Sequence, residues 1–167
     1  MSILKTIFFI IFIYSFGNSN EYIEISLDDK NQEILSKSDI LIDNSNSLTI
    51  NDIKSKSFKS NNLKRLSYGY SPDFTVWIRF RLKNITDKKI SKILEYGNPI
   101  TTNIEFYDNN NSFKDGLFQL NFSKESINPR FNIELKPNET KTYYLKANSK
   151  VTTLIIRLNI INLIITR

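Results

Sequence analysis

The sequence contains no cysteine and no histidine among its 167 residues, and it has only four glycines and four prolines. The lack of cysteine excludes disulfides and thiolate metal sites. The lack of histidine excludes Ser-His-Asp and Cys-His catalysis and the usual zinc chemistry. We therefore expect no catalytic site, no metal site and no cofactor, and we do not expect the protein to be an enzyme.

Carboxylates are the remaining groups that would support catalysis, because glycoside hydrolysis needs two of them facing each other at a fixed separation. None of the acidic residues in the central part of the chain belongs to a recognisable catalytic motif. These residues are Glu95, Glu105, Asp108, Asp115 and Glu134.

The formal net charge is +6, which raises the question of an anionic partner such as nucleic acid. The lysines are scattered among asparagines and serines, and the densest basic stretch, Lys54 to Arg65, is interrupted by serines and asparagines. The sequence shows no basic helix and no RNA-binding motif. We therefore predict no nucleic-acid partner.

The N-terminus has the pattern of a secretory signal peptide over residues 1–19. Lys5 supplies the positive charge, residues 6–16 form an apolar run, and Gly17 and Ser19 are the small residues before a cleavage site. An uncleaved N-terminal anchor is the alternative. Both place the remainder of the chain in an extracytoplasmic space.

Most of the remaining chain alternates apolar and polar residues with turn residues at intervals of roughly ten positions, as in an all-β sandwich. A polar lead-in (20–39) and a tail (162–167) flank the predicted sandwich (40–161). One helical turn is expected at 47–53, where Thr49 caps and Asp52 takes the capping-box position. The predicted strands are 40–42, 75–84, 90–96, 103–107, one near Leu117 within 113–120, 130–135, 140–147 and 152–161.

The strand at 75–84 has two different faces, because side chains in a strand alternate. Val76, Ile78, Phe80 and Leu82 form an apolar face, whereas Trp77, Arg79 and Arg81 form the other. An indole stacks on a sugar ring or another planar ligand, and a guanidinium binds a carboxylate or hydroxyls. The alternatives are that Trp77 belongs to the core and that Arg79 pairs with a buried acid such as Glu95 or Glu105.

Four further residues complete the predicted ligand-binding set. Tyr70 lies beside Gly69 in an expected loop, Tyr96 and Asn98 end the second long strand, and Arg130 follows Pro129 at the start of another strand. Each also has a structural alternative, such as plugging an end of the sandwich or capping a loop. The predicted ligand-binding residues are Trp77, Arg79, Tyr70, Tyr96, Asn98 and Arg130.

Several short segments occur in an order that resembles a known family. They are 41–43, 48–50, the Trp-x-Arg-Phe strand that ends at Asn84, 94–99, 104–107, Arg130 and 143–146. Together they resemble the type 2 extracellular sensor domain of bacterial seven-transmembrane receptors with diverse intracellular signalling modules (7TMR-DISM). The resemblance covers about residues 40–160. It implies a jelly-roll sandwich similar to carbohydrate-binding modules, and a periplasmic sensor of a small-molecule or carbohydrate ligand.

The family also implies a membrane receptor region and an inner-membrane location for the full receptor. The given sequence ends at Arg167 without such a region, so we expect an excised or truncated receptor or a free binding protein. The alternative function is a stand-alone secreted carbohydrate-binding or adhesion module, which exposed coplanar aromatic residues would favour. A third possibility is a structural domain that binds another protein through its edge strands.

Overall fold

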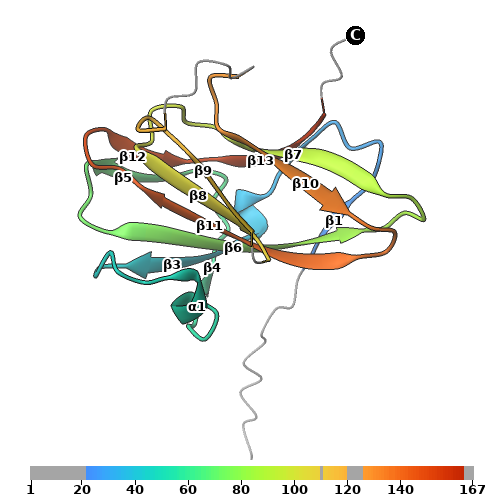
Figure 1. Ribbon diagram of the computed structural model, residues 1–167, viewed down its shortest axis with the longest axis horizontal. Coiled ribbons are helices and arrows are strands. Elements are labelled where there is room, and N and C mark those ends of the chain that lie inside the picture. Colours follow the sequence, from blue (N-terminus) through green and yellow to red (C-terminus); the bar gives the residue numbers. More distant parts are fainter. Residues whose placement is uncertain (1–21, 110, 120–125, 164–167) are drawn as a thin grey trace, which may run out of the picture.

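The computed structural model describes residues 22–109, 111–119 and 126–163 and shows a β-sandwich with two main sheets and a two-stranded ribbon (Figure 1). The predicted all-β sandwich is therefore confirmed. The predicted signal peptide, residues 1–19, lies outside the described residues, as do the last four residues of the predicted tail.

The larger sheet has seven strands, in the order β4-β3-β6-β11-β8-β9, with β1 running parallel to β6. On one side of β6 lies β11. On the other side, β3 pairs with residues 75–79 and β1 pairs with residues 82–84, so the two share one edge. The strands are β1 (Ile23–Ile25), β3 (Asp39–Asp43), β4 (Lys59–Ser60), β6 (Thr75–Asn84), β8 (Asn103–Asp108), β9 (Asn111–Asp115) and β11 (Thr140–Asn148).

The smaller sheet has the order β10-β7-β13-β2, and β5 and β12 form the ribbon. In Figure 1, β7, β10 and β13 lie above β3, β6 and β11. The strands are β2 (Asn31–Glu33), β5 (Leu66–Tyr70), β7 (Ile90–Tyr96), β10 (Arg130–Leu135), β12 (Thr153–Ile156) and β13 (Leu158–Asn162). Two short helices, η1 (Leu35–Lys37) and α1 (Ile50–Ile53), complete the described fold.

The main core lies between the two sheets. From β6 it receives Val76, Ile78, Phe80 and Leu82, the apolar face predicted from the alternation, and all four are buried. The rings of Phe80 and Tyr143 stack with centroids 5.6 Å apart. Burying apolar surface of this kind contributes roughly 25 cal/mol per Å² to stability.

Several strand predictions are confirmed at both ends, namely 75–84, 90–96 and 130–135. The predicted capping box is also present, because the Thr49 side chain accepts from the Asp52 backbone and the Asp52 carboxylate accepts from Thr49. The hairpin predicted at residues 108–111 joins β8 to β9, and Asn109 there has a positive φ of 53°.

The strand predicted near Leu117 was wrong. The strand β9 begins at Asn111 and pairs with β8 as far as Asp115, opposite Ile104, and Leu117 follows in a turn. The strand predicted at 152–161 is two strands that break at Arg157, because β12 pairs with β5 and β13 pairs with β7. The expected loop around Tyr70 is the strand β5, and the predicted lead-in contributes β1 and β2 to the two sheets.

Gly116, which follows β9, generates a stability prediction. It has a φ of +117°, and a Cβ there would lie 2.7 Å from the Thr102 carbonyl oxygen and 2.8 Å from that of Thr101. We expect Gly116→Ala to lower the free energy of unfolding by about 2–4 kcal/mol, because backbone strain and overpacking add. Urea denaturation measures this change.

The matched control is Gly69→Ala, because Gly69 also has a positive φ, of +80°, but a Cβ there would meet nothing within 4 Å. It should cost about 1 kcal/mol from strain alone. Equal losses in the two variants would contradict the role of the close approach to Thr101 and Thr102.

Candidate functional site

The outward face of β6 contains Trp77, which is fully buried although it lies outside the main core. Its ring stacks on Tyr107 of β8 with centroids 5.6 Å apart, and the Lys146 ammonium lies 5.0 Å from the ring centroid. The indole Nε1 has no hydrogen-bond partner within the described residues. Trp77 is therefore the centre of a second, smaller buried cluster on the outside of the sheet.

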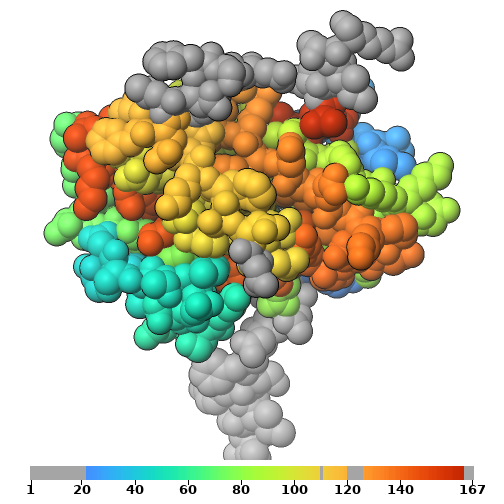
Figure 2. Space-filling model, in the orientation of Figure 1, coloured from blue at the N-terminus to red at the C-terminus, as the bar shows by residue number. Residues whose placement is uncertain are grey.

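The segment that includes α1 borders this cluster. Ile53 of α1 is fully buried, and Lys146 Nζ donates to the Leu48 carbonyl oxygen over 3.3 Å. Figure 2 shows this segment, in teal, directly beside the β8–β9 hairpin, in yellow. The sheet face next to Trp77 therefore has a wall built by residues that precede and form α1.

Asp43 fixes the start of that segment. Its carboxylate accepts hydrogen bonds from Ser45 N (3.0 Å), Ser45 Oγ (2.6 Å) and Leu48 N (3.0 Å). Burial raises the pKa of Asp43, but these hydrogen bonds and the charge of Lys146 outweigh it, so the pKa lies below its usual value. The ionised carboxylate thus holds the loop before α1 in place.

Arg79 lies next along the outward face and pairs with Asp39 of β3. Its NH2 nitrogen lies 2.8 Å from Asp39 Oδ2, and its Nε donates to the same oxygen over 3.2 Å. The guanidinium carbon lies 4.5 Å from the centroid of the Phe58 ring. The alternative that Arg79 pairs with an acid is therefore confirmed, but the acid is the partly buried Asp39, its direct neighbour across the β3–β6 pair, and not Glu95 or Glu105.

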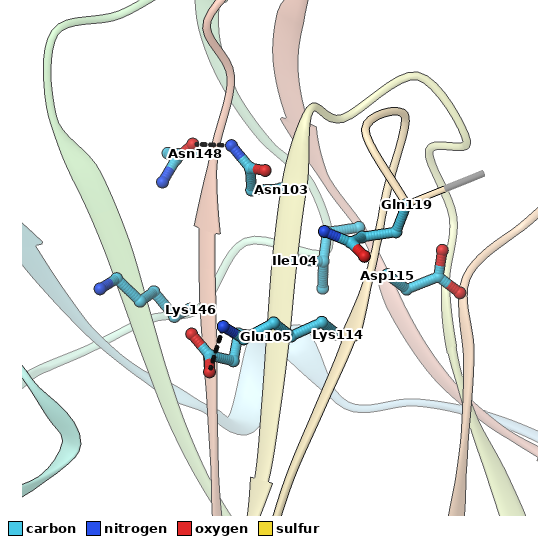
Figure 3. Close-up of a pocket in the computed structure, with 8 residues that line it drawn as sticks. All are labelled: Asn103, Ile104, Glu105, Lys114, Asp115, Gln119, Lys146 and Asn148. Atoms are coloured by element: carbon cyan, nitrogen blue, oxygen red, sulfur yellow. Dashed lines mark hydrogen bonds and ion pairs between the residues drawn. The ribbon is translucent and has the colours of Figure 1, made fainter.

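A polar pocket of about 200 Å³ opens beside this cluster, over β8, β9 and β11 (Figure 3). Lys146 of β11, Glu105 of β8 and Lys114 of β9 are direct neighbours across the strands, and Lys114 Nζ lies 3.7 Å from Glu105 Oε1. Asn103 Nδ2 donates to Asn148 Oδ1 over 2.9 Å at the other end. The lining residues are Asn103, Ile104, Glu105, Lys114, Asp115, Gln119, Lys146 and Asn148.

The chemistry of this pocket suits a small polar ligand. Glu105 and Asp115 balance Lys114 and Lys146 in formal charge, and amide groups supply both donors and acceptors. The pocket volume of about 200 Å³ lies below the range of about 300–1,000 Å³ that is usual for ligand pockets, so the pocket has room only for a small ligand such as a single sugar ring or an amino acid. Burial raises the pKa of Tyr107, and a hydrogen bond with Glu105 and the charge of Glu105 raise it further, so Tyr107 stays neutral.

Tyr96 and Asn98 lie in the interior of the sandwich. Tyr96 is fully buried, and its hydroxyl donates to the Ile155 carbonyl oxygen over 2.9 Å. Asn98 is 7% exposed, and its amide donates to Thr101 Oγ1 over 3.0 Å. Burial raises the pKa of Tyr96 well above its usual value. Both side chains hold β7 and β12 together.

Tyr70 and Arg130 lie away from the pocket. Tyr70 is 74% exposed on the ribbon strand β5. Arg130 pairs with Glu95, with its NH2 nitrogen 2.7 Å from Glu95 Oε2, on the outer face of the smaller sheet. The structure therefore distributes the six predicted residues over several surfaces and the interior, and only Trp77 adjoins the pocket. A ligand contact of any of the six stays a prediction.

Sequence reasoning missed the residues that line the pocket. Alternation was a usable signal, because Ile104 and Phe106 point inward, so Asn103 and Glu105 must point outward. The order of the strands, β6-β11-β8-β9, brings these side chains beside Trp77, and a strand order of this kind is not visible in the sequence.

The described residues contain neither a cluster of metal ligands nor a membrane-spanning helix. No group of three or more acidic side chains lies close enough there to hold a metal ion. No helix in the same part of the chain is long and apolar enough to cross a membrane.

Comparison with known protein families gives one match. The family 7TMR-DISM extracellular 2 matches residues 36–162, which is most of the chain. The match begins in η1 and ends at the last residue of β13, so it includes the pocket and all strands except β1 and β2. No curated protein matches the chain significantly.

The Asp43 loop generates a prediction on pH dependence. Asp43→Asn keeps the shape but loses the charge, and we expect it to lower the free energy of unfolding by about 1–3 kcal/mol at neutral pH. The pKa of Asp43 is lower in the folded state than its unfolded value of 3.8, so the unfolded state binds the proton more readily. The contribution of Asp43 is therefore complete above pH 3.8 and decreases as the pH falls through the folded pKa.

Urea denaturation of the two proteins at neutral and acidic pH measures this effect, and the stability difference should shrink as the solution is acidified. Asp87→Asn is the control, because Asp87 is an exposed turn residue. A difference between wild type and Asp43→Asn that stays constant down to strongly acidic pH would contradict the charged role of Asp43.

Proposed function

The chain belongs to the 7TMR-DISM extracellular 2 family, a family of extracellular domains of membrane receptors, and from this we propose that it is an extracytoplasmic ligand-sensing domain. We further propose that its ligand binds in the polar pocket beside Trp77. The main support is the row Lys146–Glu105–Lys114, which crosses three neighbouring strands next to a fully buried indole.

We propose a neutral polyhydroxylated ligand, such as a sugar ring, as the first candidate. The pocket offers three side-chain amides and ionised groups of both signs in equal number, so it has no net charge that would select an anion or a cation. Hydroxyl groups both donate and accept, and they fit a surface on which carboxylate, ammonium and amide groups alternate. The pocket volume supports one ring rather than a long chain.

Sensing requires that the ligand prefers one arrangement of the domain over another. The pocket is formed by β8, β9 and β11, whereas the adjoining wall is formed by the α1 segment, which Lys146 joins to the sheet through Leu48. A ligand that draws Lys146 toward itself competes with the Leu48 carbonyl for the ammonium. We propose this competition as the step that links ligand binding to a change at α1.

The family supports a periplasmic location and a membrane receptor as the functional context. The alternative, a stand-alone secreted carbohydrate-binding or adhesion module, would be favoured by exposed coplanar aromatic rings. Trp77 is fully buried on the candidate face, and the exposed Tyr70 lies on a separate ribbon. We therefore place the sensor function first.

A binding assay with pocket variants tests the proposal. Isothermal titration calorimetry with a panel of monosaccharides should identify a ligand of the wild type. Glu105→Gln and Asn148→Ala should each lower the affinity for that ligand. For Glu105→Gln we expect a loss of roughly 10- to 100-fold, because a hydrogen bond to a charged group contributes about 1.5–3 kcal/mol. The melting temperature should stay close to that of the wild type, since both groups lie at the surface of the pocket.

The matched control is the double variant Glu95→Gln and Arg130→Gln, which removes an ion pair from the opposite sheet whose glutamate is about as exposed as Glu105. It should bind like the wild type. Unchanged binding in Glu105→Gln together with lost binding in this control would move the site to the other face and contradict the proposed pocket.

A further inference from the structure

The sandwich is open along one side, between β3–β4 of the larger sheet and β5 of the ribbon. A groove of about 310 Å³ lies there, and its apolar lining comes from Ile40, Leu41, Ile42, Leu66 and Tyr68. Ile40, Leu66 and Tyr68 also pack against the main core, so the floor of the groove is the edge of that core. Ile42 is 36% exposed. An apolar surface that continues into the core is therefore accessible from outside.

The strands that flank this groove have free edges. On its outer side, β3 pairs with the two-residue strand β4 only at Asp39 and Ile40, so residues 41–43 have no strand partner there within the described chain. In the same part of the chain, β5 pairs with β12 alone. A free strand edge presents backbone N–H and C=O groups that readily pair with another extended chain.

The chain segment that supplies Lys59 to the groove lining, called the basic rim from here on, is positively charged. From residue 54 to residue 72 the sequence contains five basic residues and no acidic one. All five are exposed, and none forms an ion pair with another described residue. Leu63 in the same stretch is 55% exposed. The five basic residues are Lys54, Lys56, Lys59, Lys64 and Arg65.

The acidic residues nearest to the groove already have partners. Asp39 binds Arg79, Asp43 accepts hydrogen bonds from Ser45 and Leu48, and Asp52 caps α1. Asp43 and Asp52 keep their negative charge, because their hydrogen-bond donors are neutral, and the pKa of Asp52 is lowered by its hydrogen bonds and by the charge of Lys56. The five basic residues outnumber these two carboxylates, so the segment keeps an excess of positive charge.

We propose that this groove binds an extended acidic segment of a partner protein, which adds as a strand to the free edge of β3. Alternate side chains of such a segment would enter the apolar groove, and acidic ones would meet the basic rim. A second copy of this chain fits less well, because it has a net charge of +6 and would bring the same basic rim. An anionic lipid surface offers the charge but no backbone groups for the strand edge. This groove shares no lining residue with the polar pocket.

Fluorescence anisotropy with a labelled heptapeptide of alternating glutamate and valine tests the proposal. The peptide should bind saturably, and the affinity should fall as salt is added, because screening weakens contacts between exposed charges. The same peptide with lysine for glutamate should not bind. The glutamate peptide with proline at the central valine should bind much more weakly, because proline cannot donate to a strand edge.

Two variants locate the site. Lys64→Glu with Arg65→Glu should weaken binding roughly tenfold, since each reversed contact is worth up to about 1 kcal/mol. Ile42→Glu should weaken it at least as much, because it places a charge in the apolar groove. The control is Lys88→Glu with Lys150→Glu, which makes the same change in net charge at exposed sites outside the groove and should leave the affinity unchanged.

Amide hydrogen exchange adds a second readout that does not depend on charge. The amide of Ile42 faces the free edge of β3, whereas those of Leu41 and Asp43 face β6, so the Ile42 amide should gain protection when the glutamate peptide binds. Equal weakening by the control pair, or equal binding of the proline peptide, would overturn the proposal in favour of general polyanion binding. Binding to anionic phospholipid vesicles without binding to the peptide would overturn it in favour of a membrane surface. If neither the glutamate peptide nor the vesicles bind, the proposal is overturned. The lysines would then serve only to keep the free edge of β3 from pairing with other strands.

Discussion

The burial of β6 on both of its faces is the constraint on which the rest of this structure depends. Its inner face fills the core between the sheets, and its outer face positions Trp77 in a second buried cluster. The strand pairs with β11 along one side and with β3 and β1 along the other. At its end, the buried Asn84 amide donates to the carbonyl oxygens of Lys88 (2.7 Å) and Lys136 (2.8 Å), which fixes two turns. Strands from both halves of the chain are thereby held in one register.

Local features of the fold could be predicted from the sequence because local residues determine them. Alternation and turn residues gave both ends of β6, and Thr49 with Asp52 gave the cap of α1. The break at Arg157 was missed, since Leu154, Ile156, Leu158 and Ile160 are all buried and alternate as if in one strand. Only the partners of β12 and β13 reveal that the chain passes from one sheet to another at that point.

The candidate site was less predictable, because it depends on contacts between distant residues. The sequence identified Trp77 and its outward direction, but its full burial results from neighbours such as Lys146 and Tyr107, which are far away in the chain. Arg79 lies on the same face, yet Asp39 already binds it. The segment from Leu48 to Ser60 contributes to two surfaces, because Leu48 holds Lys146 of the pocket, while Ser57 and Ser60 line the groove beside β3.

The most direct test of the ligand site is the indole N–H signal of Trp77 in a ¹H–¹⁵N NMR spectrum, which is a single peak because the chain has one tryptophan. Neutral monosaccharides would be titrated into the labelled protein. A sugar that binds in the pocket should shift this peak saturably, together with backbone amides of β8 and β11. A sugar that instead shifts the amides around Glu95 and Arg130, while the indole peak stays in place, would contradict the proposed ligand site.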